Sequence, residues 1–194
     1  MDASIDPTDE ALMRQSLSGD LFARERLAER FLPDVHRLCR YLLRNHSAVD
    51  DAVQECFLRV FRYLKRWDGR PPRPWILTIA YNRCVTLRQQ AGRIRHESYP
   101  REPIHQAMQH ESLVESELEK AIASALASIR PEFKDALVLH HVLGQSVEDV
   151  AIQMSVPLGT AKTWLSRGRK ALWEILKSNG HVEGDIPRQV REDR

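Results

Sequence analysis

The sequence predicts an all-α fold made of two small helical domains joined by a flexible linker. Apolar residues recur at spacings of three and four along several segments, whereas no segment shows the period-two alternation of a strand. Over residues 93–111 the apolar pattern stops, and prolines and histidines take its place. With 194 residues, of which 42% are hydrophobic, the chain is long enough to bury two small cores.

The first predicted domain covers residues 10–92 and begins with two helices. The pattern over residues 20–32 is the weaker one, and that over 34–44 is regular, with Pro33 near the start of the second helix. The strongest apolar stripe follows in residues 47–67, behind an N-cap at Ser47.

Residues 68–74 interrupt this helical pattern with a glycine and three prolines. A further helix restarts at Pro74, runs to about Gln90 and is expected to end at Gly92. The linker is then expected over residues 93–111.

The second predicted domain covers residues 112–178. Ser112 and Glu115 have the spacing of a capping box, and a second helix is expected from Pro131 to Gly144. A short helix over 146–154 and a three-residue turn lead into a long helix over 158–177. Residues 179–194 are polar and are predicted to form a flexible tail.

The charges are unevenly distributed, although the net charge is only +2. Residues 59–95 hold ten basic side chains against one acid, and residues 158–177 hold five against one. The stretch between these blocks, residues 97–119, holds six glutamates and one arginine. Two basic blocks indicate two surfaces that meet an anion, although solvated helix faces would give the same pattern.

A short helix, a tight turn and a longer basic helix form the plan of a helix-turn-helix. Short hydroxyls and long cations near the start of a protruding helix suit a DNA major groove. The alternative is an ordinary amphipathic surface helix. The predicted DNA contacts are Thr160, Lys162, Thr163, Ser166, Arg167, Arg169 and Lys170.

Three segments resemble the extracytoplasmic-function (ECF) sigma factors of the sigma-70 family. Residues 146–151 (SVEDVA) and 156–169 (VPLGTAKTWLSRGR) resemble the domain that reads the −35 element in this family. Residues 50–60 (DDAVQECFLRV) are similar to its helix that binds core RNA polymerase, and residues 75–82 (WILTIAYN) to the start of its −10-reading helix. The resemblance extends over about residues 12–176.

This resemblance implies a polymerase-binding surface on the helix over 47–67. The family positions that dock on the polymerase correspond here to Asp51, Gln54, Glu55 and Leu58, which fall outside the apolar stripe. Two carboxylates beside an amide and a leucine suit a basic, partly apolar partner. A solvated acidic helix start, favoured by the helix dipole, is the alternative explanation.

The resemblance also implies a surface that melts and captures the −10 element. Capture of a single strand requires cations for phosphates and flat side chains for bases. Thr86, Gln89 and Trp164 depart from the common family pattern, so the promoter sequence cannot be transferred from better-known members. The candidate −10 contacts are Arg62, Arg66, Trp67, Arg73, Tyr81, Asn82, Arg83 and Arg88.

No cofactor, metal or catalytic residue is predicted. His36 and Cys39 share a helix face but have no second pair of matching spacing, and no nucleophile or phosphate-loop motif occurs. No apolar run approaches the roughly 18 residues of a membrane helix, and the polar N-terminus is unlike a signal peptide. The cysteines have no disulfide-type spacing. We therefore expect a cytoplasmic protein that is not an enzyme.

The partners expected for such a chain are core RNA polymerase, promoter DNA and an anti-sigma factor, and the free chain is expected to be monomeric without membrane insertion. A stand-alone helix-turn-helix repressor or activator is the main alternative, and it would bind a palindrome as a dimer. A nucleic-acid-processing enzyme would need clustered acids, which the basic blocks lack. A decoy that mimics a sigma factor is disfavoured by the complete recognition helix.

Overall fold

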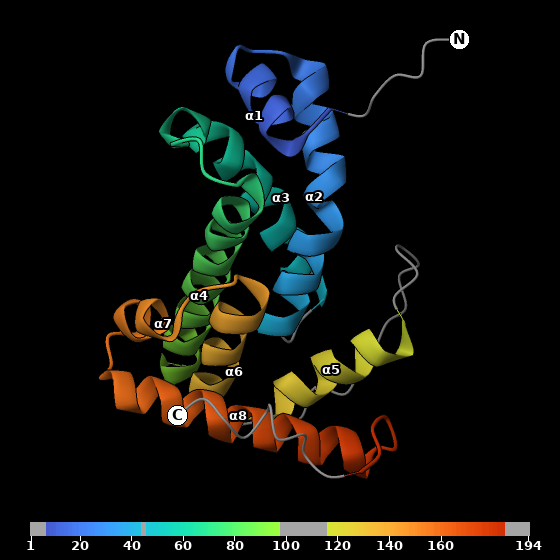
Figure 1. Ribbon diagram of the computed structural model, residues 1–194, viewed down its shortest axis with the longest axis vertical. Helices are drawn as coiled ribbons and strands as arrows, with labels where there is room; N and C mark the ends of the chain where they lie inside the picture. Colours follow the sequence, from blue (N-terminus) through green and yellow to red (C-terminus); the bar gives the residue numbers. More distant parts are fainter. Residues whose placement is uncertain (1–6, 44–45, 98–115, 185–194) are drawn as a thin grey trace.

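The computed structural model describes residues 7–43, 46–97 and 116–184, and every regular element in these ranges is a helix (Figure 1). The first unit contains α1 (Asp9–Leu17), α2 (Leu21–Leu42), α3 (His46–Tyr63), the 3-10 turn η1 (Leu64–Arg66) and α4 (Pro72–Glu97). The second contains α5 (Glu117–Ser128), α6 (Pro131–Leu137), the π-helix η2 (Val138–Val142), α7 (Val147–Met154) and α8 (Leu158–Ser178).

One continuous helix, α2, replaces the two helices expected over residues 20–32 and 34–44. Pro33 lies inside it on the exposed side, although a proline cannot donate the backbone hydrogen bond of a helix interior. Phe31 and Val35, on either side of Pro33, are both buried. Their packing holds the helical path through a residue that would otherwise favour a break, so the local signal is overridden by the core.

The start of the first unit is held by side-chain caps. Thr8 accepts a hydrogen bond from the Ala11 N–H at 3.2 Å and begins α1, a helix that the sequence pattern did not reveal. Asp20 Oδ1 accepts the N–H groups of Phe22 and Ala23 at 2.9 and 3.2 Å and begins α2. Helices α2, α3 and α4 then pack together, with α1 against α2.

Helix α4 is longer than expected at both ends. It begins at Pro72, not Pro74, and continues through Gly92 to Glu97, so its last residues occupy the start of the expected linker. A glycine within a helix costs only about 1 kcal/mol relative to alanine, which is too little to stop a helix of this length. The rest of the expected linker lies outside the described residues.

The second unit is arranged around α8, which contacts α5, α6 and α7 (Figure 1). Pro131 opens α6 as expected, and α6 continues as a single π-helical turn. A capping box joins Ser116 and Glu119 at the start of α5, whereas the box expected at residues 112 and 115 lies outside the described residues.

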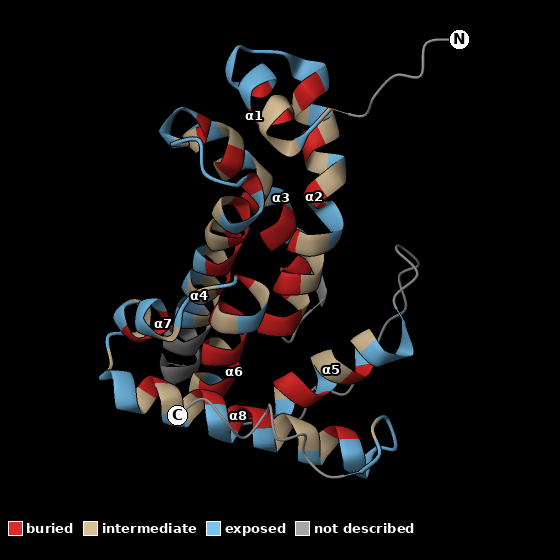
Figure 2. Cartoon of the chain, in the orientation of Figure 1, coloured by how far each residue is buried: buried red, intermediate tan, exposed pale blue. Residues whose placement is uncertain are grey.

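The two units lie in contact, and most of their buried residues belong to one hydrophobic cluster, whereas Ala121, Ala125 and Leu176 form a second, smaller one (Figure 2). Helix α2 touches α5 and η2 as well as the helices of its own unit. Among the described residues, no helix is both long enough and apolar enough to cross a membrane.

Candidate nucleic-acid and polymerase-binding surfaces

The helix-turn-helix is set by a cap at one end of α7 and a left-handed residue at the other. Ser146 Oγ accepts the Asp149 N–H at 3.1 Å and donates to the Asp149 carboxylate at 2.7 Å. Ser155 ends α7 with φ 55°, and the Val156 N–H then donates to the Ala151 carbonyl at 3.0 Å. The chain is thereby turned directly into α8.

The buried side of α8 leaves one face of its first half open. Ala161 and Leu165 are fully buried, which points Thr163, Ser166 and Arg167 outward. The Thr163 hydroxyl donates to the Gly159 carbonyl at 2.8 Å, and its methyl group remains available to a partner. Lys170 is also exposed, while Thr160 and Lys162 are half-buried.

Arg169 differs from the other predicted recognition residues, because only 9% of its surface is exposed. Its neighbour Gly168 is also buried and lies where α8 meets α6. In this conformation Arg169 therefore faces the protein and not the outer face of α8. The periodicity of the helix placed it near the boundary of the polar face, where pattern alone does not decide burial.

The outer face of α3 carries the four predicted polymerase contacts. Asp51 and Gln54 are exposed, and Leu58 is 61% exposed although it is a large apolar side chain. Glu55 is half-buried, and its carboxylate pairs with Arg59 at 2.8 Å. The structure therefore brings all four residues to one side of the helix, opposite the buried Cys56.

Only some of the predicted −10 residues lie on an open surface. Arg62, Arg66 and Asn82 are exposed, and the Arg66 guanidinium lies over the Tyr63 ring at 4.9 Å from its centroid. Trp67 is half-buried, with its Nε1 donating to the Arg70 carbonyl at 2.8 Å. These cations and rings gather where α3, η1 and the following loop meet.

The other predicted −10 residues are covered or engaged. Tyr81 is 5% exposed, and this burial raises the pKa of its phenol. Arg83 and Arg88 are half-buried, and Arg88 forms a two-pronged ion pair with Asp135 of α6. Arg73 is exposed but pairs with Asp34 at 2.6 Å.

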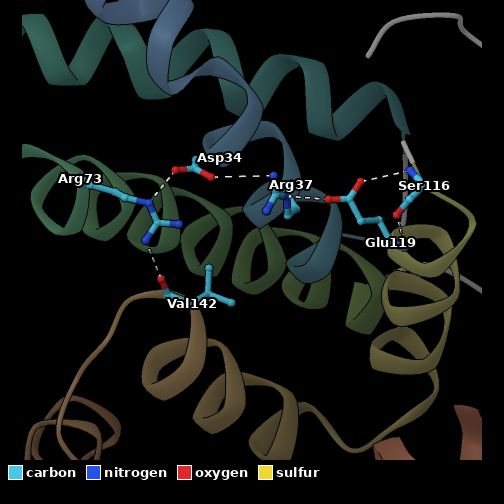
Figure 3. Close-up of polar contacts among 6 residues, drawn as sticks. All are labelled: Asp34, Arg37, Arg73, Ser116, Glu119 and Val142. Atoms are coloured by element: carbon cyan, nitrogen blue, oxygen red, sulfur yellow. Dashed lines mark hydrogen bonds and ion pairs between the residues drawn. The ribbon is translucent and has the colours of Figure 1, made fainter. Parts of the chain in front are cut away.

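A row of polar contacts joins the two units beside these residues (Figure 3). Arg73 of α4 pairs with Asp34 of α2 and also donates to the Val142 carbonyl of η2 at 3.4 Å. Arg37, one turn after Asp34, pairs with Glu119 of α5 at 3.2 Å. Sequence reasoning missed these partners, because they are far apart along the chain and form no motif.

The comparisons with known proteins agree with this arrangement. The chain matches Sigma-70 region 2 over residues 27–94 and Sigma-70 region 4 over residues 119–172. The ECF RNA polymerase sigma factor SigC of Mycobacterium tuberculosis is 30% identical over 177 residues, covering 88% of this chain and 92% of that protein. The chain belongs to the ECF sigma factors.

A second relative is considerably longer than the part of it that the chain matches. The ECF sigma factor SigE of Mycolicibacterium smegmatis is 32% identical over 146 residues, which are 73% of the chain but only 57% of SigE. The chain thus spans little more than half of that relative, whereas it covers 85% of SigM of Mycobacterium tuberculosis at 28% identity.

Two solved structures share the fold of the sigma factor. CnrH, determined in complex with the cytosolic domain of CnrY, gives a TM-score of 0.58 at 22% identity over 88% of this chain and 98% of CnrH. RpoE of Bartonella quintana, determined with the anti-sigma factor NepR, gives a TM-score of 0.59 at 24% identity. The match covers 79% of this chain and 96% of RpoE.

Proposed function

We propose that this sigma factor directs core RNA polymerase to specific promoters, with α8 reading the −35 element and the first unit opening the −10 element. The observation that carries the proposal is the open face of α8 in a chain of this family, with Thr163, Ser166 and Arg167 outward. An arginine fork matches the acceptors of guanine, and hydroxyls and methyl groups suit neighbouring base edges. Each correct contact contributes about 1–3 kcal/mol of discrimination.

The −10 step uses the cations and rings near η1. We expect exposed Arg62 and Arg66 to meet phosphates and the rings of Tyr63 and Trp67 to stack on unpaired bases. Promoter opening then depends on binding energy, and no covalent step by this chain is required.

The polymerase contact is assigned to the outer face of α3. Leu58 exposes an apolar side chain beside Asp51 and Gln54, a combination that suits a partner helix carrying both basic and apolar groups. The sigma factor would act with polymerase in the cytoplasm. An anti-sigma factor is a further proposed partner, since RpoE of Bartonella quintana, which shares the fold, was solved with the anti-sigma factor NepR.

The test is a pull-down of the tagged chain with purified core polymerase, followed by run-off transcription on sheared genomic DNA. Stoichiometric binding and new, discrete transcripts are expected. Tight duplex binding by the free chain without polymerase binding would contradict the proposal and favour a stand-alone repressor.

Single variants separate the two surfaces. Arg167→Ala and Lys162→Ala should weaken promoter binding and leave polymerase binding unchanged, while Asp51→Ala and Glu55→Ala should do the reverse. Lys177→Ala is a matched control, because this exposed lysine lies at the far end of α8. Equal effects of all four variants on both assays would contradict the assignment.

A further inference from the structure

The contact between the two units engages Arg88, which the sequence predicts to be a contact of the −10 element. Arg88 of α4 donates to both carboxylate oxygens of Asp135 of α6, at 2.8 and 2.6 Å. The two side chains are only 25% and 15% exposed. Paired, charge-assisted hydrogen bonds in a partly desolvated place are among the stronger polar interactions of proteins.

Asp135 makes the largest favourable contribution to the charge of Arg88, and Tyr81 and Cys84 also contribute. Burial alone would lower the pKa of its guanidinium, but the hydrogen bonds and negative charge of Asp135 more than offset burial and raise the pKa. The guanidinium fork binds a carboxylate and a phosphate with the same geometry. Asp135 occupies the fork formed by Nη1 and Nη2 of Arg88, so a phosphate can take this two-pronged position only by displacing Asp135.

Other polar contacts also join the units, including the Arg37–Glu119 ion pair described above. Lys134, the residue before Asp135, is buried and donates to the Leu42 carbonyl at the end of α2 at 3.3 Å. Arg73 donates to the Val142 carbonyl of η2 while it pairs with Asp34 of α2 (Figure 3). Asp135, Lys134 and η2 thus bring the second unit against the helices that carry the −10 candidates.

The closed arrangement is too compact for both promoter elements. Positions −35 and −10 lie about 85 Å apart along straight duplex, at about 3.4 Å per base pair. Asp135 lies on α6, which packs against α8. With helix axes about 10 Å apart and α8 about 30 Å long, the recognition face lies within about 40 Å of Arg88. The units must separate before both elements can be held.

We propose that Asp135 is an intramolecular competitor for Arg88, and that the Arg88–Asp135 pair with the Lys134–Leu42 bond latches the free sigma factor closed. The inference rests on the proposed −10 role of the first unit, but the latch itself is a property of the DNA-free chain. A phosphate that binds at the Nη1–Nη2 fork of Arg88 must displace Asp135, so closure lowers the apparent affinity in proportion to the fraction of open molecules.

The experiment compares Asp135→Asn with wild type in the full chain, because asparagine keeps the size of the side chain and removes its charge. Small-angle scattering without DNA should show a larger radius of gyration. A short fluorescein-labelled single strand of mixed sequence should bind about tenfold more tightly, which corresponds to about 1.4 kcal/mol. Glu132→Gln is the matched control, since Glu132 lies on the same helix and pairs instead with Arg130.

A second pair of variants keeps the test decisive if Asp135→Asn is poorly folded. The double exchange Arg88→Asp with Asp135→Arg restores the pair in reverse, so the radius should return to the wild-type value while strand binding is lost. Lys134→Met should increase the radius of gyration, as Asp135→Asn does. If Asp135→Asn and Lys134→Met both fold and keep the wild-type radius of gyration and the wild-type affinity for the single strand, the proposed latch is refuted.

The scattering result separates the latch from the proposed function. If the radius increases but no variant binds the strand, the latch stands and the −10 assignment fails. If the strand binds through the first unit with no change of radius in any variant, the −10 assignment stands and the latch is refuted.

Discussion

Helix α8 packs tightly against α6 at Gly168, and an added methyl group there should destabilise the second unit. A Cβ at this position would lie 3.1 Å from Leu137 Cγ, 3.2 Å from Leu137 Cδ1 and 3.2 Å from Phe133 Cβ. Phe133 Cβ is attached directly to the backbone of α6 and cannot move away alone. Gly168→Ala therefore requires the two helices to shift apart.

Two opposing contributions decide the magnitude. Alanine in place of glycine in a helix interior contributes about 1 kcal/mol of helix stability. Overpacking of a tightly packed contact costs about 1–3 kcal/mol, and here two neighbours on α6 are involved. We expect a net loss of about 1 kcal/mol in the free energy of unfolding, or a decrease of about 2–4 °C in melting temperature for a chain of this size.

The assay is urea and thermal unfolding monitored by circular dichroism, with Gly159→Ala as the matched control. Gly159 lies in the same helix with no atom within 4 Å of an added Cβ, so the same exchange should stabilise the chain by about 0.5 kcal/mol. Opposite signs for the two variants are expected. A stabilising Gly168→Ala would refute the close contact between α6 and α8.

Two further predictions concern the cap of α7 and the buried thiols. Ser146→Ala removes the acceptor of the Asp149 N–H and should cost about 1 kcal/mol in urea unfolding, whereas Ser166→Ala, on the open face of α8, should cost less than 0.5 kcal/mol. Burial raises the pKa of the Cys56 thiol from 9.0 to about 12, so the unfolded chain releases this proton first and stability should decrease as pH rises from about 9 towards 12. Cys56→Ala should abolish that part of the decrease in pH-dependent unfolding, and an unchanged slope would contradict the assignment.

The elements that the sequence predicted well are those fixed by neighbouring residues. The Ser146 cap, the start of α6 at Pro131 and the order of helix, turn and long helix in the second unit depend on interactions within a few positions. The outer faces of α3 and α8 followed from the helical period, because their buried sides form continuous stripes.

The elements that it missed depend on residues distant in the chain. The residues around Pro33 indicate a helix start, but the burial of Phe31 and Val35 keeps α2 continuous. The sequence around Arg88 gives no sign of an ion pair, because its partner Asp135 lies 47 positions away in the other unit. Burial of Tyr81 likewise depends on how α4 meets other helices, which a single sequence pattern does not encode.

The continuity of α2 has a consequence for any attempt to divide the chain. This helix is about 33 Å long and contacts α1, α3 and α4 as well as α5 and η2. A fragment cut after α4 would leave the end of α2 near Tyr41 and Leu42 without the second unit, and would expose apolar surface that promotes self-association. Although two family regions can be recognised in the sequence, in the closed form they share one buried core.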